Sequence, residues 1–481
     1  MRRLLTYSFE QAGGKPLYEQ LYTCIRDDIL SGCLRAGEKL PSKRALARNL
    51  GVSTITVEGA YGQLTAEGYC QSAPRRGFFV TNVVPRQQQQ MQAMLAKQVA
   101  DKSTVKKEWL ADFSANSVPA ELFPFDLWTR LLRKVVNEDA AALLERSASF
   151  GVPLLRQAIA GHLRSFRGLT VQPEQIVIGA GTEYLYNLLV QFLGRDRRFC
   201  VENPGYDRIR QIYTASGADC VLADMDAQGV IPAELTRQKA QILHISPSHH
   251  FPTGIIMPVS RRYELLGWAA AAKDRYIIED DYDSEFRLTG RPIPTMMGID
   301  VSDRVIYMNT FSKSLTPTIR ISYMVLPQEL VAPFKEKLGF YSCTVSNFEQ
   351  YTLARFIRDG YFEKHINRMR NFYRRKRERL LAMLKTAPQS NQIKIIEHGS
   401  GLHFLVQFAI AEKDADFCRR LAAEGIRMRP LEAYYEGDCK PGAHIFVLNY
   451  SGVPDERLEE AVKRLLVCVD CCRSSEDKNK K

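Results

Sequence analysis

The segment Asn309–Leu315 contains the residues with the clearest chemical potential. Lys313 lies between two serines, follows an apolar run that predicts a strand (Val305–Met308), and precedes Arg320 by seven residues. A lysine amine can form an imine with an aldehyde cofactor, and a serine and an arginine can neutralise its phosphate. Because an isolated lysine is usually solvated, this interpretation needs other segments that would complete the site.

A second segment, Tyr276–Asp283, ends an apolar run with acidic residues. A carboxylate at the end of a buried strand is costly unless it has a cationic partner. A protonated pyridine nitrogen is such a partner, and an aspartate keeps it charged so that the ring accepts electrons. A metal site is the alternative interpretation of Asp280 and Asp281. No histidine or further carboxylate spacing supports it, so no metal is predicted.

Two further segments fit a phosphorylated ring. Gly179–Glu183 follows the predicted strand Ile176–Ile178 and opens a predicted helix, where backbone N–H groups and the Thr182 hydroxyl can face a phosphate. Glu202–Tyr206 supplies an aromatic ring, Tyr206, that can stack on the cofactor.

These segments need a framework, and the chain from about Asp112 onward provides one by alternating apolar β-like runs with amphipathic helices. This alternation is typical of an α/β fold. We predict four parts: a winged helix-turn-helix (α+β) over residues 1–84, a polar linker over 85–111, a cofactor-binding α/β domain over 112–470, and a disordered tail over 471–481.

The N-terminal part has the pattern of a DNA reader. A predicted helix begins after Pro16 and places one apolar stripe in the core, formed by Leu17, Leu21, Ile25, Ile29 and Leu30. Ser42 and Ser53 are suited to cap two further helices, and Gly51 lies in the turn between them, as in a helix-turn-helix. Two short β runs then flank Arg75 and Arg76, which predicts a hairpin wing.

The third helix of such a unit can enter a major groove of double-stranded DNA while basic side chains meet phosphates. A winged helix that only contacts proteins is the alternative, and the basic edges disfavour it. Short polar side chains, including Glu58, are available to read bases. The predicted DNA-binding residues are Ser42, Lys43, Arg44, Ser53, Thr54, Thr56, Arg75 and Arg76.

These motifs resemble known families. Leu40-Pro41-Ser42, Gly51-Val52-Ser53 and Gly77-Phe78-Phe79-Val80 resemble the winged-helix domain of the GntR family, although Thr54 stands where that family often has an arginine. The region from about Asp112 to Val469 resembles fold-type-I, aspartate-aminotransferase-like enzymes. The whole chain, through Ile278–Phe286 and Thr310–Leu315 in particular, resembles the MocR/GabR subfamily, in which the two are fused.

The resemblance implies pyridoxal 5'-phosphate as cofactor and gives roles to individual residues. Lys313 would form the Schiff base, Asp280 would pair with the pyridine nitrogen, Tyr282 would bond the ring oxygen, and Tyr206 would cover the ring. The phosphate would be held by Gly181, Thr182, Ser312 and Arg320.

The resemblance also implies a sensor. An amino compound, GABA-like or an amino acid, would form an external aldimine, free Lys313 and shift operator affinity. Arg208 lies where a GABA-responsive member binds the effector carboxylate. The second arginine of that member falls near Ala433, and the neighbouring Arg427 and Arg429 are interpreted as solvated strand residues.

Two departures argue against efficient turnover. Val447 stands where aminotransferases place the substrate-carboxylate arginine, and Phe251 stands where they usually have an asparagine. We therefore predict a regulator that is not an efficient enzyme. A working aminotransferase is one alternative, and a regulator whose effector is pyridoxal phosphate itself is another.

Composition agrees with a DNA-binding protein of the cytoplasm. The 481 residues carry a formal charge of +12, which permits a polyanionic partner. No apolar run approaches the roughly 18 residues that span a bilayer, so no membrane contact is predicted. The eleven cysteines are scattered apart from Cys468, Cys471 and Cys472, which suits reduced thiols. Fold-type-I sites form at dimer interfaces, so a homodimer is expected.

Overall fold

The computed structural model describes residues 5–7, 9, 16–82, 108–115, 117–288, 293–397, 399–437, 442 and 444–472. The chain divides into two compact units, Met1–Lys107 and Glu108–Lys481. Most of the predicted linker (85–111) and of the predicted tail (471–481) lies outside the described residues, although β3 (Ala111–Asp112) and the end of α17 at Cys471 are described. None of the described helices is both long enough and apolar enough to cross a membrane.

The N-terminal unit contains three helices and a β-hairpin. Leu21, Ile25, Val57, Tyr61 and Leu64 are buried at its centre. The prediction that Leu17 belongs to the buried stripe of the first helix is wrong, because Leu17 is the first residue of that helix and is 45% exposed. The hairpin pairs Cys70 with Val80 and Ala73 with Gly77. The elements are α1 (Leu17–Leu30), α2 (Lys43–Leu50), α3 (Thr54–Ala66), β1 (Cys70–Ala73) and β2 (Gly77–Val80).

The larger unit is built on an eight-stranded sheet with the order β4-β11-β10-β9-β8-β5-β6-β7. The pairs from β10 through β9, β8 and β5 to β6 are parallel, whereas β11 is antiparallel to both of its neighbours. The strands are β4 (Ile176–Gly179), β5 (Arg198–Asn203), β6 (Asp219–Asp226), β7 (Gly229–Val230), β8 (Ile242–Ile245), β9 (Tyr276–Asp280), β10 (Val305–Thr310) and β11 (Ser322–Val325).

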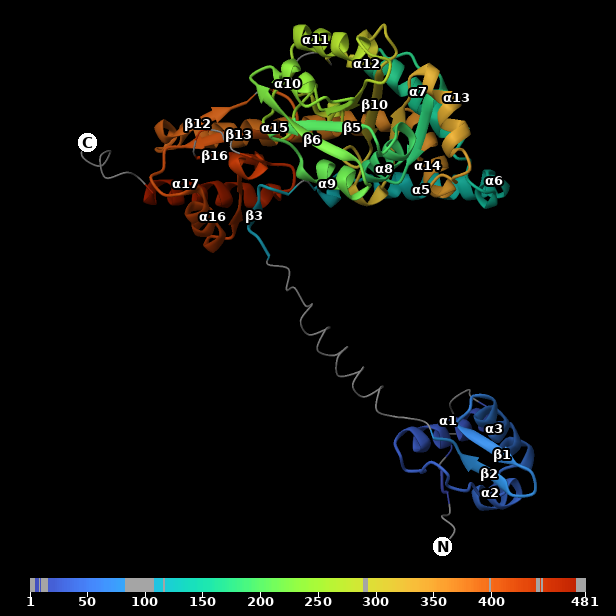
Figure 1. The fold of residues 1–481 in the computed structure, drawn as a ribbon. Helices are drawn as coiled ribbons and strands as arrows, with labels where there is room; N and C mark the ends of the chain where they lie inside the picture. The colour runs from blue at the N-terminus through green and yellow to red at the C-terminus, as the bar shows by residue number, and fades with distance from the viewer. Residues whose placement is uncertain are drawn as a thin grey trace. The chain divides into compact units, whose positions relative to one another are not determined.

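Helices cover both faces of this sheet (Figure 1). Alternate residues of one strand enter different cores: Ile178 packs with α7 and α14, whereas Val177 packs with α8 and α13. Burial on both faces explains why the strands are almost continuously apolar. The helices are α5 (Phe125–Glu138), α6 (Ala140–Leu144), α7 (Pro153–Arg167), α8 (Thr182–Leu193), α9 (Asp207–Ala215), α10 (Pro232–Arg237), α11 (Val259–Ala270), α12 (Met296–Ile299), α13 (Gln328–Leu338) and α14 (Asn347–Arg358).

The chain continues through the 26-residue helix α15 (Tyr361–Thr386) into a smaller sheet with the order β12-β13-β16-β15. A separate parallel pair joins β14 to β3, which brings Ala111 beside Ile426. The remaining elements are β12 (Ile393–Ile396), β13 (His403–Phe408), β14 (Ile426–Arg427), β15 (Arg429–Pro430), β16 (Ile445–Asn449), α16 (Asp414–Ala423) and α17 (Leu458–Cys471).

Candidate functional site

The residues predicted to bind the cofactor lie on or close to the ends of strands at one edge of the large sheet. Thr310, at the end of β10, is opposite Ser322, and Ser322 is opposite Gly179 at the end of β4. Asp280 ends β9 and is paired with Met308, two residues before Thr310. Ligands bind beyond the carboxyl ends of parallel strands in open α/β sheets, so this edge is the expected place for a site.

Lys313 lies in the turn between β10 and β11. The Phe311 amide donates to the Ile321 carbonyl at 2.9 Å, and the Leu315 amide donates to the Phe311 carbonyl at 2.8 Å, which fixes the turn. Burial lowers the pKa of the Lys313 amine to about 8, although the carboxylates of Asp283 and Asp280 partly offset this effect. The amine is therefore much more often neutral than an ordinary lysine, as a nucleophile must be.

Asp280 is buried and held by groups that the sequence analysis missed. The Tyr186 hydroxyl donates to Asp280 Oδ2 at 2.6 Å, and His244 Nε2 lies 3.5 Å from the same oxygen. His244 is itself held by the Tyr213 hydroxyl, 2.7 Å from Nδ1. The other oxygen, Oδ1, is buried and has no hydrogen-bond partner among the described residues. A protonated pyridine nitrogen could donate its N–H to this Oδ1 atom.

Gly181 and Arg320 are in contact at the start of α8. Gly181 has a φ of +94°, which favours glycine, and a Cβ atom there would lie 2.4 Å from Arg320 Nη2, so Arg320 would have to move for any larger residue. Arg320 Nη2 also donates to the Ala180 carbonyl and to Glu183, both at 3.3 Å. Thr182 begins the helix. A guanidinium and free helix N–H groups thus face the same region, as phosphate binding requires.

Ser312 and Tyr282 lie near these groups in other hydrogen bonds. The Thr310 hydroxyl donates to Ser312 Oγ at 2.9 Å. The Tyr282 hydroxyl is 3.4 Å from His249 Nδ1, which in turn is 2.7 Å from Asp283 Oδ2. The His249–Asp283 pair was not predicted. His249 immediately follows Ser248 and lies three residues before the turn Pro252-Thr253-Gly254, and its place before this turn was the available signal.

The predicted ring-stacking and effector residues are more open. Tyr206 immediately precedes α9 and is 44% exposed, with its ring edge-on to Phe251 at a centroid distance of 6.0 Å. Arg208 is exposed; its guanidinium lies 5.9 Å from the Tyr206 ring centroid and 3.9 Å from Glu183. Arg208 therefore already contacts a carboxylate and the Tyr206 side chain, although an anion can still reach its exposed guanidinium.

The strand position without an arginine, Val447, is buried and lies opposite Arg429 on β15. Arg429 is engaged: its guanidinium lies 4.3 Å from the Tyr434 ring centroid, and Nη2 donates to the Ala433 carbonyl at 3.0 Å. Arg427 points elsewhere and is 3.4 Å from Asp112. Arg429 therefore packs on an aromatic ring, whereas the sequence interpretation treated it as solvated.

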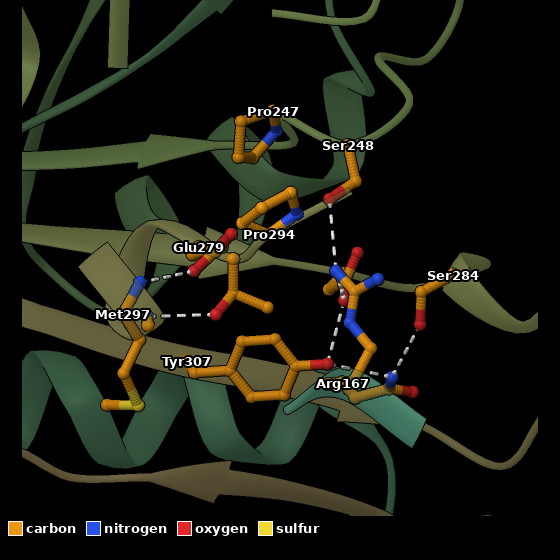
Figure 2. A network of polar contacts seen from close by, with 12 residues as sticks. Arg167, Pro247, Ser248, Glu279, Ser284, Pro294, Met297 and Tyr307 are labelled. Carbon is orange, nitrogen blue, oxygen red and sulfur yellow. Dashed lines mark hydrogen bonds and ion pairs between the residues drawn. The ribbon is translucent and has the colours of Figure 1, made fainter. Parts of the chain in front are cut away.

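A buried network supports the strand end that carries Asp280 (Figure 2). Arg167, at the end of α7, forms an ion pair with Asp281 at 2.8 Å, and both side chains are nearly inaccessible. The Tyr307 hydroxyl donates to Asp281 at 2.8 Å. Glu279 accepts from the Met297 amide at 3.0 Å, and burial together with the Asp281 charge raises its pKa to about 7. Arg167 is therefore the ionic partner of Asp281, one of the two aspartates for which the sequence had suggested a cofactor or a metal as partner.

The N-terminal unit presents the start of α3. Ser42 accepts from the Ala45 amide at 3.3 Å and Ser53 from the Thr56 amide at 3.1 Å, so both predicted helix caps are confirmed. Thr54 and Ile55 are exposed at the start of α3, Ile55 to 80%.

Basic residues flank this helix. Lys43 Nζ lies 2.6 Å from Glu58, and Arg44 is exposed on the same first turn of α2. The wing turn carries Arg75, with a φ of +60°, and Arg76, whose guanidinium lies 5.9 Å from the Phe79 ring centroid. Both wing arginines are exposed. The predicted DNA-binding residues therefore lie at the surface, where the two caps Ser42 and Ser53 are exposed and Lys43 and Thr56 are half-buried.

Comparisons with known proteins agree with these two units. Residues 17–80 match the family described as bacterial regulatory proteins, gntR family, and residues 112–465 match aminotransferase class I and II. The chain is 37% identical to the uncharacterised HTH-type transcriptional regulator YhdI of Bacillus subtilis, over 96% of this chain and 97% of that protein. It is 31% identical to the probable rhizopine catabolism regulatory protein MocR of Rhizobium meliloti, over 94% and 93%.

The fold is also similar to solved structures. The crystal structure of kynurenine aminotransferase from Pyrococcus horikoshii superimposes with a TM-score of 0.65 and 24% identity, covering 81% of this chain and 95% of that one. Together with the family matches, this likeness confirms the predicted fold class: a winged helix-turn-helix joined to a fold-type-I α/β unit.

Proposed function

Because the chain belongs to the MocR/GabR subfamily of GntR-family regulators, we propose that it is a DNA-binding transcription regulator that senses an amino compound through pyridoxal phosphate. The observation that carries the proposal is the unused buried oxygen of Asp280 at the same sheet edge as Lys313. A unit that only supports a DNA reader would gain nothing from a buried carboxylate oxygen without a hydrogen-bond donor.

The residues present fit this cofactor. Asp280 Oδ1 lacks a partner that a pyridinium would supply. Gly181 has no side chain at the start of α8, so a phosphate could approach the backbone there beside Arg320. When bound, pyridoxal phosphate supplies an aldehyde carbon that can exchange the Lys313 amine for the amine of an effector. Tyr206, Tyr282, Thr182 and Ser312 would complete its contacts.

Lys313 and its surroundings prepare this exchange. Burial favours the neutral amine, whereas Asp283 and Asp280 favour the charged one, so the amine can gain or lose a proton near neutral pH. Arg208 would hold the effector carboxylate, because it is exposed beside Tyr206 and its nearest described carboxylate oxygen is 3.9 Å away. A displaced Lys313 would then favour a different arrangement of the protein on DNA.

DNA recognition is assigned to the first unit. The exposed start of α3 would enter the major groove, and Lys43, Arg44, Arg75 and Arg76 would contact phosphates. A homodimer would present two such units to two half-sites. We further propose that turnover is inefficient, because Val447 leaves β16 without a carboxylate-binding arginine.

The test is an absorbance titration of the purified protein with a panel of amines that includes GABA, with Lys313→Ala and the exposed-lysine control Lys335→Ala. We expect a cofactor band that one amine shifts stably, that Lys335→Ala keeps and that Lys313→Ala loses. Release of a keto product over repeated turnovers would instead identify an enzyme. If cofactor loading alone switches DNA binding in a fluorescence-anisotropy assay, pyridoxal phosphate is the effector.

A further inference from the structure

A cavity away from the cofactor residues lies between α7 and α15 in the C-terminal unit. Its volume is about 140 Å³, roughly ten times the 10–15 Å³ that one water molecule needs by the same measure. Residues at helical spacing on these two helices form its lining, which is polar apart from Phe166 and Ile366: His162, Ser165 and Phe166 from α7, and Glu363, Ile366, Asn367 and Arg370 from α15. A small organic molecule fits this space.

Arg370 brings a positive charge without a carboxylate partner. Its Nε atom donates to the Glu285 carbonyl, and its guanidinium lies 5.0 Å from the Phe166 ring centroid. In the part of the chain that the structure describes, no carboxylate lies within ion-pair distance of Arg370, and its two Nη atoms donate to no residue. Burial lowers the pKa of this arginine, which reflects the lost hydration of the charge. An anion in the cavity would satisfy these donors.

His162 is a second group whose hydrogen bonds are unused. Its side chain is only 7% exposed, stacked on Phe166 at 5.3 Å and edge-on to Phe362 at 5.0 Å. Neither ring nitrogen bonds to a described residue, and the ring lines the cavity. Burial, with help from the charges of Arg167 and Arg370, lowers the pKa of His162 to about 4. The imidazole is therefore neutral at pH 7 and offers the cavity one donor and one acceptor.

We propose that this cavity is a second ligand site, which binds a small organic carboxylate. The carboxylate would pair with Arg370 and the Asn367 amide, and the apolar part of the ligand would lie against Phe166 and Ile366. Glu363 at the exposed edge would favour ligands that also carry a positive group. This site does not use Lys313, so the proposal is independent of the amine sensor.

The position of the cavity connects it to the cofactor residues. On one wall, Phe166 is followed by Arg167, which pairs with Asp281. On the other wall, Arg370 holds the Glu285 carbonyl, in the short helical turn Ser284–Phe286. Both walls therefore contact the segment that begins with Asp280. A bound carboxylate would stiffen this segment and shift the absorbance of the loaded cofactor.

The test uses full-length, cofactor-loaded protein and propionate, which has no amine and so cannot react at Lys313. Saturation-transfer NMR and calorimetry would measure binding to the unchanged protein, Arg370→Gln, Asn367→Leu and the control Arg374→Gln. Arg374 is exposed one turn further along α15. We expect at least tenfold weaker binding in Arg370→Gln and Asn367→Leu, with Arg374→Gln unchanged.

Asn367→Leu keeps the bond from Arg370 to the Glu285 carbonyl, so it tests the cavity even if Arg370→Gln fails to fold. The proposal is overturned if propionate does not bind the unchanged protein, or binds Asn367→Leu equally well. Loss of binding only in Arg208→Gln would place the carboxylate at the effector residues and also overturn it. Inorganic phosphate that displaces propionate at lower concentration would show that the cavity selects simple anions instead.

Discussion

Removing one partner of the Arg167–Asp281 ion pair should destabilise the C-terminal unit strongly. The pair is 2.8 Å long, and its side chains are 3% and 1% exposed. Each single change, Arg167→Met or Asp281→Asn, leaves the other member buried without its counter-charge, or with a weaker neutral partner. A buried pair broken in this way typically costs about 3–5 kcal/mol. Asp281→Asn should fall at the lower end, because the amide can still accept from the Tyr307 hydroxyl.

The double variant carries the decisive information. With both charges removed, no buried charge is left uncompensated, so the loss should be smaller than the sum of the two single losses by roughly 2 kcal/mol or more. This difference separates a true pair interaction from the loss of packing. Lys463→Ala, which breaks the exposed pair with Glu459 on α17, is the matched control and should leave the unfolding curve unchanged.

Urea denaturation followed by tryptophan fluorescence is the suitable assay. The three tryptophans, Trp109, Trp128 and Trp268, all belong to the C-terminal unit, so the signal reports only on it. Cofactor-free protein should be used, because a bound ligand adds its own stabilisation. The reasoning is refuted if both single variants lose less than about 1 kcal/mol, or if the single losses simply add in the double variant.

Three further predictions concern the cofactor residues and the wing. Tyr186→Phe removes the hydroxyl that donates to Asp280, and a hydrogen bond of this kind contributes about 1.5–3 kcal/mol. Spectroscopic titration should therefore show cofactor affinity falling roughly 10- to 100-fold. Unchanged affinity would contradict the assigned role of Asp280. The rate of cofactor loading should rise with pH, because the neutral Lys313 amine attacks: with a pKa of about 8, its neutral fraction grows from roughly one-tenth at pH 7 to nine-tenths at pH 9. A rate that climbs steadily to pH 10.5 would show an ordinary lysine. Replacing both Arg75 and Arg76 with alanine should weaken binding to all DNA sequences alike and lower the slope of log affinity against log salt by about 2; a change in sequence preference alone would refute the assignment to phosphates.

Local patterns were sufficient to predict part of this molecule. Ser42 and Ser53 were identified as caps because a cap is defined by residues only a few positions apart. The strand that precedes Lys313 was predicted from a similarly short apolar run, Val305–Met308, which lies within β10. Leu17 shows the limit of such patterns, since periodicity gives the face of a helix but not where the core ends along it.

Long-range partners could not be predicted in this way. Tyr186 reaches Asp280 across 94 residues, and it is the sheet order that brings α8 beside β9. Tyr186 does lie one helical turn after Thr182, so a helix with its first turn at the cofactor would place Tyr186 on the same side. Arg167 offers no comparable signal, because its pairing depends on the packing of α7 against the sheet.

The separation of the hydrophobic cores has an evolutionary consequence. The buried hydrophobic residues of the N-terminal unit lie between Leu5 and Val80, and those of the C-terminal unit lie at Ala111 or later. A substitution at an exposed position of α3, such as Ile55, therefore leaves the packing around Lys313 untouched. Descendants of one ancestral gene can change the exposed residues of α3 while keeping those around Lys313, or the reverse. The two sets of residues can therefore diverge at different rates.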